Sequence, residues 1–211
     1  INVLVYAAQK IIGNKVTDAI ALFPINSPFF KPHQVITHMF AHSPSSLMHI
    51  IFNMLGLWMF GSMLEKYWGG KKFLIFYLLS GLAAAALHLI MQYLRNPEVG
   101  QITQAMYDQA VATEGYIPKY FLGGAVGASG AVMGVMAAFA YLFPNTPLFM
   151  MFIPIPIKAK IAIPIMVAID LFGGFAGIPG DNIAHFAHLG GAIAGFLLVL
   201  YWNKTNKKTF Y

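Results

Sequence analysis

The chain has 211 residues, of which 58% are hydrophobic and 9% are charged, and its mean hydropathy is +0.67. Because soluble domains carry about 25% charged residues, this composition excludes an ordinary water-soluble protein and favours a membrane protein. The formal net charge is +6, but the lysines lie between apolar stretches, where membrane orientation explains them better than nucleic-acid binding does. The lack of cysteine excludes disulfide bonds and thiolate chemistry.

Apolar stretches long enough to cross a bilayer recur along the chain. A hydrocarbon core needs about 20 apolar residues in helical form. The stretches and the turn signals between them predict helices at 1–14, 45–65, 72–94, 128–143, 160–175 and 183–202. We therefore expect an all-α, polytopic membrane bundle of six transmembrane helices, with residues 1–211 forming a single domain. The chain opens on INVLVYAA rather than on Met, so we expect its first helix to be truncated at the N-terminus.

The basic residues favour one orientation of these helices. With a cytoplasmic N-terminus, eight lysines fall on the cytoplasmic side and four Lys or Arg residues fall outside. The eight are Lys66, Lys71, Lys72, Lys158, Lys160, Lys204, Lys207 and Lys208, and the four are Lys15, Lys31, Arg95 and Lys119. We expect both termini to be cytoplasmic and the membrane to be a bacterial plasma (inner) membrane.

The helix expected at 128–143 is too short to span the whole core. A Gly-rich run at 123–127 precedes it and Pro144 ends it. Its 16 or so residues would measure about 24 Å at 1.5 Å per residue, less than the ~30 Å of hydrocarbon. Its outer end therefore lies below the membrane surface. Non-helical backbone at that depth must line protein or a wet cavity, so we expect a cavity open to the outside.

Polar side chains inside the spans converge at one depth. His49, Asn53, Ser129 and His188 all fall in the outer third of the bilayer on the expected helices, and polar groups there are costly and usually functional. A histidine beside Ser129 would take the hydroxyl proton as the serine attacks a carbonyl. His49, Asn53 and the Ser129 backbone N–H could then stabilise the oxyanion.

Small residues predict that two of these helices approach closely. The helices at 128–143 and 183–202 each carry a GxxxG pair just after the Ser or the His, a spacing that lets backbones pack tightly. The pairs are Gly130 with Gly134 and Gly191 with Gly195. Such packing would bring Ser129 within hydrogen-bond reach of His188.

Three motifs on these helices resemble those of the rhomboid intramembrane serine proteases. They are GASG at 127–130, His49-x-x-x-Asn53, and AHLGG at 187–191, and the likeness extends in order over about residues 35 to 200. The resemblance implies a Ser129–His188 dyad without a cofactor or a metal, and an oxyanion hole made by His49, Asn53 and the Ser129 amide. It also implies substrates that are transmembrane segments of other proteins, cut near the outer face, with helix 160–175 and loop 176–182 as a lateral gate and cap.

Four further residues are expected to support the site: Gly127, Gly130, Met133 and His185. Met133 stands where some relatives carry an aromatic residue stacked on the catalytic histidine, so the orientation of the histidine is less well specified here. For His38, His42 and His88 a structural role is expected. Asp170, ten residues into its helix, is expected to have a structural or gating role rather than a catalytic one.

Other functions remain open at this point. A catalytically silent relative that binds transmembrane helices is the main alternative, although Ser129 and His188 are both present. A membrane metal enzyme would need more ligands than the seven histidines supply, and no His is followed by Glu as in HExxH. A transporter commonly has an internal repeat, and the sequence shows none.

Overall fold

The computed structural model describes residues 1–95, 101–115, 124–149, 155–176 and 184–205. Within them four helices are long and apolar enough to cross a membrane. These are Leu47–Trp68 (α4 Leu47–Gly56, η2 Leu57–Gly61 and α5 Ser62–Trp68 in succession), α6 Gly70–Arg95, α9 Ala159–Ala176 and α10 His185–Thr205. The apolar helix α8, Ser129–Leu142, is shorter.

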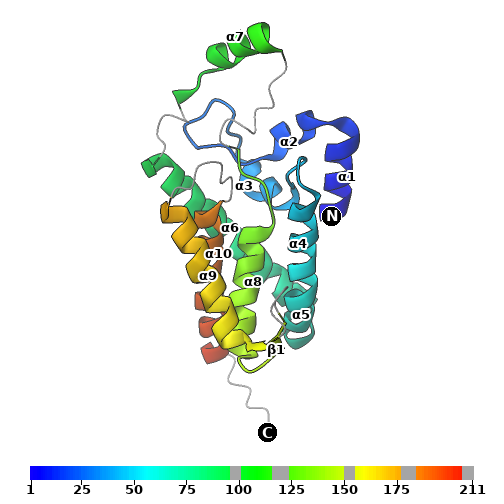
Figure 1. Cartoon of the computed structure of the whole chain (residues 1–211), viewed down its shortest axis with the longest axis vertical. Coiled ribbons are helices and arrows are strands. Elements are labelled where there is room, and N and C mark those ends of the chain that lie inside the picture. Colours follow the sequence, from blue (N-terminus) through cyan, green and yellow to red (C-terminus); the bar gives the residue numbers. More distant parts are fainter. Residues whose placement is uncertain (96–100, 116–123, 150–154, 177–183, 206–211) are drawn as a thin grey trace.

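Helix α8 lies at the centre of the bundle, with α4 and α5 on one side and α9 and α10 on the other (Figure 1). Eight of its residues are buried, among them Val135 and Phe139 at the middle of the main apolar cluster. Phe60 and Phe76 reach this cluster from the neighbouring helices. The shortness of α8, expected from the sequence, is therefore combined with a central position in which the other helices enclose it.

Glycines let α8 and α10 touch along their backbones. A Cβ atom added to Gly191 would collide with the carbonyl oxygen of Gly130, and one added to Gly195 would collide with Gly134. A Cβ atom at Gly134 would lie 2.8 Å from the carbonyl oxygen of Gly191. The close approach predicted from the GxxxG pairs is thus present, and it fixes the separation between the first turns of the two helices.

The helix Leu47–Trp68 contains one irregular turn. Residues Leu57–Gly61 form a π-helical segment, η2, in which the backbone takes one more residue per hydrogen-bonded ring than in an α-helix. A Cβ atom at Gly61 would lie 2.9 Å from the ring of Phe73, so α6 packs closely against the lower part of this helix.

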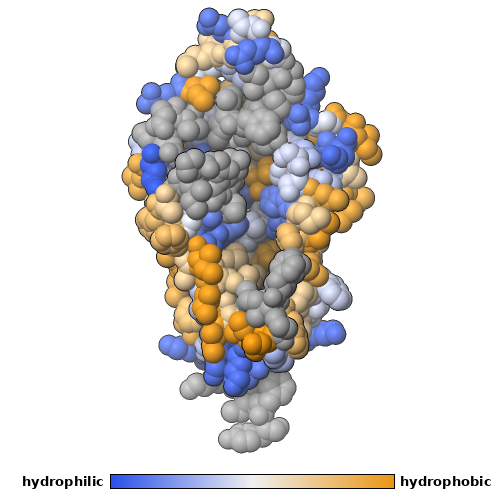
Figure 2. Space-filling view, in the orientation of Figure 1, coloured by the Kyte–Doolittle hydropathy of each residue, from blue (hydrophilic) through white to orange (hydrophobic). Residues whose placement is uncertain are grey.

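Shorter elements form the end of the molecule that carries the beginning of α8. They are α1 Asn2–Ile12, α2 Asn14–Ile20, α3 Gln34–Thr37, the 3-10 turn η1 His38–Phe40, and α7 Gln104–Glu114, which lies at the top of Figure 1. The opposite end carries a short hairpin, β1 Pro147–Leu148 paired antiparallel with β2 Ile157–Lys158. Figure 2 shows apolar side chains gathered over the middle of the molecule, with hydrophilic ones towards both ends.

The sequence predicted most of these elements with small errors at the ends. The helix expected at 1–14 is α1, which has 11 residues and ends at Ile12. Within the described residues, four of the six expected spans are long enough to cross a membrane, and the other two, α1 and α8, are shorter. The short helices α2, α3 and α7, the turn η1 and the hairpin were not predicted, since they fall in expected loops and connections. The expected cap at 176–182 lies almost wholly outside the described residues, and residues 152–154 of the Pro-rich connection also lie outside them.

Candidate active site

The segment before Ser129 is held in place by backbone hydrogen bonds. Leu22 and Ala125 exchange two such bonds, both of 2.9 Å, and the N–H of Gly127 donates to the carbonyl oxygen of His38 at 3.0 Å. Gly127 has a φ of +138°, a conformation that residues with a side chain rarely adopt. The chain then enters α8 at Ser129, whose own N–H has no acceptor within the helix.

The hydroxyl of Ser129 is hydrogen-bonded to His188. Their Oγ and Nε2 atoms lie 2.7 Å apart, and the two residues come from the first turns of α8 and α10, which the glycine contacts bring together. Both side chains are partly buried. The structure thus places the two residues that the sequence singled out in direct contact, across 59 positions of the chain.

The other ring nitrogen of His188 faces a carboxylate. Nδ1 lies 3.0 Å from Oδ2 and 3.1 Å from Oδ1 of Asp170, on α9. A carboxylate only accepts hydrogen bonds, so the proton of a neutral His188 ring sits on Nδ1. Nε2 is then unprotonated and free to accept the proton of the Ser129 hydroxyl, which is the protonation state that a general base needs.

His49 is oriented in the opposite way. The backbone N–H of Ser43 donates to its Nδ1 at 3.0 Å, so in the neutral ring the proton sits on Nε2. A Cβ atom built at Gly127 would lie 2.9 Å from this Nε2 and 3.4 Å from Oγ of Ser129. The N–H donor of His49 and the Ser129 hydroxyl therefore border the same small space, which stays open because Gly127 has no side chain.

Asn53 lies one turn further along α4 and is buried. Its Nδ2 donates to the carbonyl oxygen of His49 at 2.8 Å, and its Oδ1 has no hydrogen-bond partner among the described residues. An amide NH₂ carries a second hydrogen. Asn53 thus lies on the same face of α4 as His49. Among the described residues it makes no hydrogen bond to Ser129, whereas His188 does.

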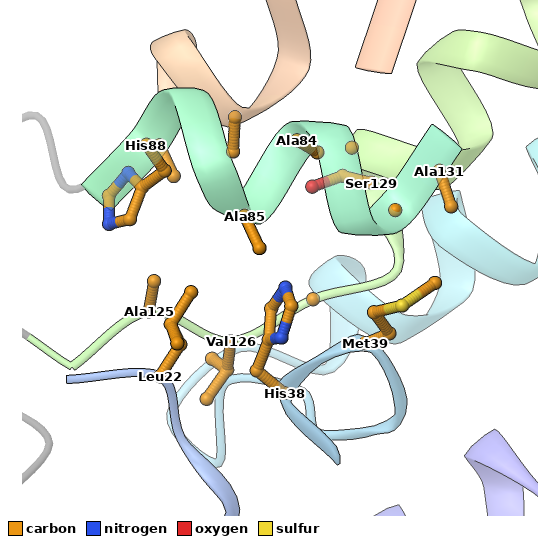
Figure 3. Close-up of a pocket in the computed structure, with 15 residues that line it drawn as sticks. Leu22, His38, Met39, Ala84, Ala85, His88, Ala125, Val126, Ser129 and Ala131 are labelled. Carbon is orange, nitrogen blue, oxygen red and sulfur yellow. The ribbon is translucent and has the colours of Figure 1, made fainter. Parts of the chain in front are cut away.

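A cavity of about 20 Å³ lies behind Ser129. It is lined by residues of α6, η1, the segment before α8 and the beginning of α10, and Figure 3 labels His38, His88 and Ser129 around it. One water-sized sphere occupies about 10–15 Å³. The cavity therefore has room for a water molecule next to the Ser129 hydroxyl and between the rings of His38 and His88, for which a structural role was predicted.

His42 supports the site from the loop before α4. Its ring packs edge-on against that of His49, with centroids 5.3 Å apart. Gln9 of α1 binds the backbone of His42 on both sides, donating to its carbonyl oxygen at 2.8 Å and accepting from its N–H at 3.0 Å. Burial, and to a smaller extent the nearby His49, lowers the pKa of His42 to about 4. The ring is therefore neutral at physiological pH.

The remaining residues expected at the site occupy different positions around it. Gly130 packs against Ala84 and, at 3.2 Å from a built Cβ, against the carbonyl oxygen of Ala187. Met133 packs against the main apolar cluster. His185 donates from Nδ1 to Oδ1 of Asp170 at 2.8 Å. Asp170, for which a structural or gating role was expected, contacts Nδ1 of His188 directly, a contact that the sequence did not predict.

Two of the other histidines, His38 and His185, have hydrogen-bond partners of their own. Within the described ranges, no group of three or more His, Cys, Asp or Glu side chains is arranged to hold a metal ion. Nδ1 of His38 is hydrogen-bonded to the carbonyl oxygen of Gln34 at 2.8 Å, and Nδ1 of His185 is hydrogen-bonded to Asp170.

Comparison with known proteins decides the family. The rhomboid domain model matches residues 30–204, from the loop before α3 to the last turn of α10. The chain belongs to the rhomboid family. The matched region includes both α8, which carries Ser129, and α10, which carries His188. The match confirms the resemblance predicted from the sequence motifs.

Curated relatives of the rhomboid domain come from mitochondria and bacteria. Rhomboid protein 1, mitochondrial, of Saccharomyces cerevisiae is 29% identical over 168 residues, which is 80% of this chain and 42% of the relative. Presenilin-associated rhomboid-like protein, mitochondrial, of Homo sapiens is 31% identical over 157 residues, or 74% of this chain and 35% of the relative. Rhomboid protease GlpG of Salmonella newport is 31% identical over 116 residues, or 54% and 39%.

The chain corresponds to less than half of the length of each of these relatives. The matched part of the chain spans 42%, 35% and 39% of the length of these three relatives. The rhomboid domain is homologous to rhomboid serine proteases, and the chain is a multi-pass membrane protein of mainly helical structure.

Proposed function

We propose that this protein is an intramembrane serine endopeptidase that cuts transmembrane segments of other membrane proteins. The observation that carries the proposal is the 2.7 Å contact between Oγ of Ser129 and an Nε2 of His188 that is left unprotonated by the carboxylate on its other side. A hydroxyl beside a correctly protonated base is the minimal arrangement for nucleophilic attack on a peptide carbonyl.

The proposed reaction follows from these positions. Oγ of Ser129 forms a bond to the carbonyl carbon while Nε2 of His188 takes the hydroxyl proton. The N–H of Ser129 and Nε2–H of His49 donate to the oxygen that becomes negative, and a donor in such a position stabilises the transition state by about 3–4 kcal/mol. His188 then passes its proton to the leaving amine, which gives an acyl-enzyme. A water molecule, deprotonated by His188, releases the second product.

The position of the site supports a membrane substrate. Ser129 begins the short helix α8, inside a bundle whose outer surface is apolar. We expect a substrate segment to reach it between helices, with its scissile bond freed from helical hydrogen bonds near the outer face. No cofactor or metal enters the proposed reaction, and nucleic acid has no part in it.

The orientation of the protein in the membrane is also a proposal. Lysines cluster at the end of the bundle opposite the site, as Lys66, Lys72, Lys158 and Lys204 illustrate. By the preference of Lys and Arg for the cytoplasmic side, this end faces the cytoplasm and the site opens to the outside. We propose a bacterial plasma membrane, with both termini inside. Membrane fractionation and cysteine-accessibility labelling at each end test this, since the native chain has no cysteine.

The decisive experiment compares labelling and cleavage in matched variants. A fluorophosphonate probe should label the wild-type protein and Ser62→Ala, which alters a serine at the start of α5, but not Ser129→Ala. Cleavage of a model transmembrane substrate in proteoliposomes should follow the same pattern. Cleavage by Ser129→Ala at the wild-type rate would exclude Ser129 as the nucleophile.

The same experiment tests the second candidate function. A catalytically silent relative would bind the model substrate without cutting it. It would also leave the probe unreacted in the wild type. The hydrogen-bonded Ser129–His188 pair favours the protease, because a helix-binding function alone does not require that contact.

A further inference from the structure

One acidic side chain lies within the span α9, where an ionised group is costly unless it is paired. The carboxylate of Asp170 is 16% exposed and faces α10 rather than lipid. It accepts from Nδ1 of His185 at 2.8 Å and from Nδ1 of His188 at 3.0 Å. Two imidazoles one turn apart on α10 thus hold one carboxylate of α9, and one of these imidazoles is the proposed general base.

We propose that Asp170 is the positioning residue of a Ser129–His188–Asp170 triad, and that this triad is complete only while the outer half of α9 lies against α10. The inference deepens the proposed protease function and depends on it. A triad takes the place of the dyad implied by the family resemblance. Asp170 then has a single role in place of the structural or gating role expected from the sequence: it orients the base, His188, and does so only when α9 is in contact with α10.

The chemistry of the third residue follows from its two oxygens. By accepting from Nδ1, the carboxylate keeps the proton of neutral His188 on that nitrogen and Nε2 available for the serine proton. When His188 becomes an imidazolium, the negative charge beside it stabilises the positive one, and Asp170 stays ionised throughout. The bond from His185 to Oδ1 fixes the carboxylate, so His185 acts through Asp170 and not on the substrate.

The two halves of α9 are held in different ways. At the inner end Ala159, Ala162 and Ile163 are buried in the bundle. In the outer half, by contrast, Ile169 and Phe172 are 68% and 73% exposed. The outer half is therefore attached by fewer apolar contacts than the inner half, and Asp170 lies in this more weakly attached part.

The outer half is fixed to its neighbours mainly by small-residue and polar contacts. A Cβ atom at Gly173 would lie 2.8 Å from Cε1 of His185, so α9 and α10 are in close contact there. Beyond it, Arg95 of α6 donates to the carbonyl oxygen of Gly174 at 2.5 Å and lies over the rings of Phe175 and Phe186. A displacement of this half of α9 would withdraw Asp170 from His188 while leaving the Ser129–His188 contact between α8 and α10 in place.

The first test removes the charge without changing the shape. Asp170→Asn should lower kcat on a model substrate by about 10²–10⁴-fold, which is the range seen when a base loses its positioning carboxylate or its function. The KM should change less than about twofold, because Asp170 does not contact the substrate. Fluorophosphonate labelling of Ser129 should slow in parallel. The matched control Asp108→Asn makes the same chemical change on α7, where Asp108 accepts from Gln104, and should behave as the wild type.

A purely structural role for Asp170 predicts a different result. It would lower the melting temperature and the amount of folded protein, with kcat per folded molecule unchanged. In addition, residues that act as a unit are not additive, so Asp170→Asn combined with His188→Ala should be no slower than His188→Ala alone. Wild-type kcat in folded Asp170→Asn would overturn the triad while leaving Ser129-dependent cleavage, and thus the proposed function, intact. Absence of cleavage by the wild type would instead reject the proposed function itself.

The second test displaces the outer half of α9 without substituting a residue of the triad. Gly173→Ala places a methyl group against His185 and should lower kcat by about 10-fold to 10²-fold, since a displacement near 1 Å can have such an effect. Phe172→Ala, in the same turn but on the exposed face, is its control and should leave kcat unchanged. Wild-type kcat in Gly173→Ala would show that the close contact of α9 with α10 is not needed.

Discussion

The Nε2 atom of His49 faces the space that the missing side chain of Gly127 leaves open beside Ser129. The relationship joins two motifs that are far apart in the sequence, since Gly127 belongs to the nucleophile segment and His49 to α4. It gives a reason for the glycine two residues before the proposed nucleophile, because a side chain there would fill the space that the proposed reaction assigns to the substrate oxygen.

Filling that space should abolish activity at a moderate cost in stability. In Gly127→Ala the added methyl group would lie 2.9 Å from Nε2 of His49 on a backbone with φ +138°. We expect kcat/KM on a model transmembrane substrate to fall by at least about 10²-fold, as for loss of an oxyanion donor. Gly115→Ala is the control, because its φ of +84° is strained too but no described residue lies within 4 Å of the added group. Equal losses in both variants would assign the effect to backbone strain alone.

Removal of the His49 donor should slow the chemical step. We expect His49→Ala to lower kcat by about 10²–10³-fold with little change in KM, because the hydrogen bond to the oxyanion forms in the transition state. Asn53→Ala should lose less, since its amide is already bonded to the His49 carbonyl oxygen. His33→Ala alters an exposed histidine that binds the carbonyl oxygen of Ala19 and should retain full activity. A larger loss in Asn53→Ala than in His49→Ala would reverse the proposed assignment of the oxyanion donors.

The glycine contact between α8 and α10 should be a point of high sensitivity to size. Gly191→Ala directs a methyl group into the carbonyl oxygen of Gly130, and overpacking of this kind costs about 1–3 kcal/mol. Thermal unfolding in detergent should show a lowered midpoint, and activity should fall further because the Ser129–His188 distance depends on this packing. Ile193→Ala, at a site 48% exposed on the same helix, should change neither. An unshifted midpoint in Gly191→Ala would mean that the helices separate without cost.

His42 should make stability depend on pH. Burial, and then the nearby His49, lowers the pKa of His42 from 6.5 to about 4, so the unfolded chain binds a proton at a higher pH than the folded one. The neutral ring therefore contributes stability that is fully present above pH 6.5 and is lost as the pH falls towards 4. Unfolding followed between pH 7 and pH 4 should show a smaller decline for His42→Asn than for the wild type. Parallel pH profiles would contradict this role of the histidine.

Sequence reasoning predicted the elements whose signal is local. The uninterrupted apolar runs located α6 and α10 to within a few residues, and the glycine pairs predicted the contact between α8 and α10. Helix α7 was missed because most of its residues are polar, although Tyr107 packs against Phe29 in a small apolar cluster near the beginning of the chain. Its one local signal was Thr103, whose side chain accepts from the N–H of Met106 as an N-cap does.

The sequence predicted the depth in the bilayer of the candidate site residues, but not the direction in which their side chains point. The position of a residue along a span gives its depth in the bilayer, which was enough to group Ser129, His188 and His49. Whether Asp170 faces lipid, the bundle or the site depends on how α9 is rotated against α10, and that rotation follows from tertiary contacts such as that of Gly173 with His185. The roles of His38 and His88 around the cavity depend in the same way on packing between helices.

The π-helical turn η2, Leu57–Gly61, lies between His49 and the inner part of the same helix. The direction of the His49 side chain is therefore set separately from the packing of that inner part. Each residue of an α-helix advances the side chains by about 100°, so deleting one residue elsewhere in 47–68 would turn His49 away from Ser129 or Leu64 out of the core. A deletion inside the π-helical turn could be absorbed by its conversion to a regular one. This segment can therefore change length while both ends of the helix keep their partners.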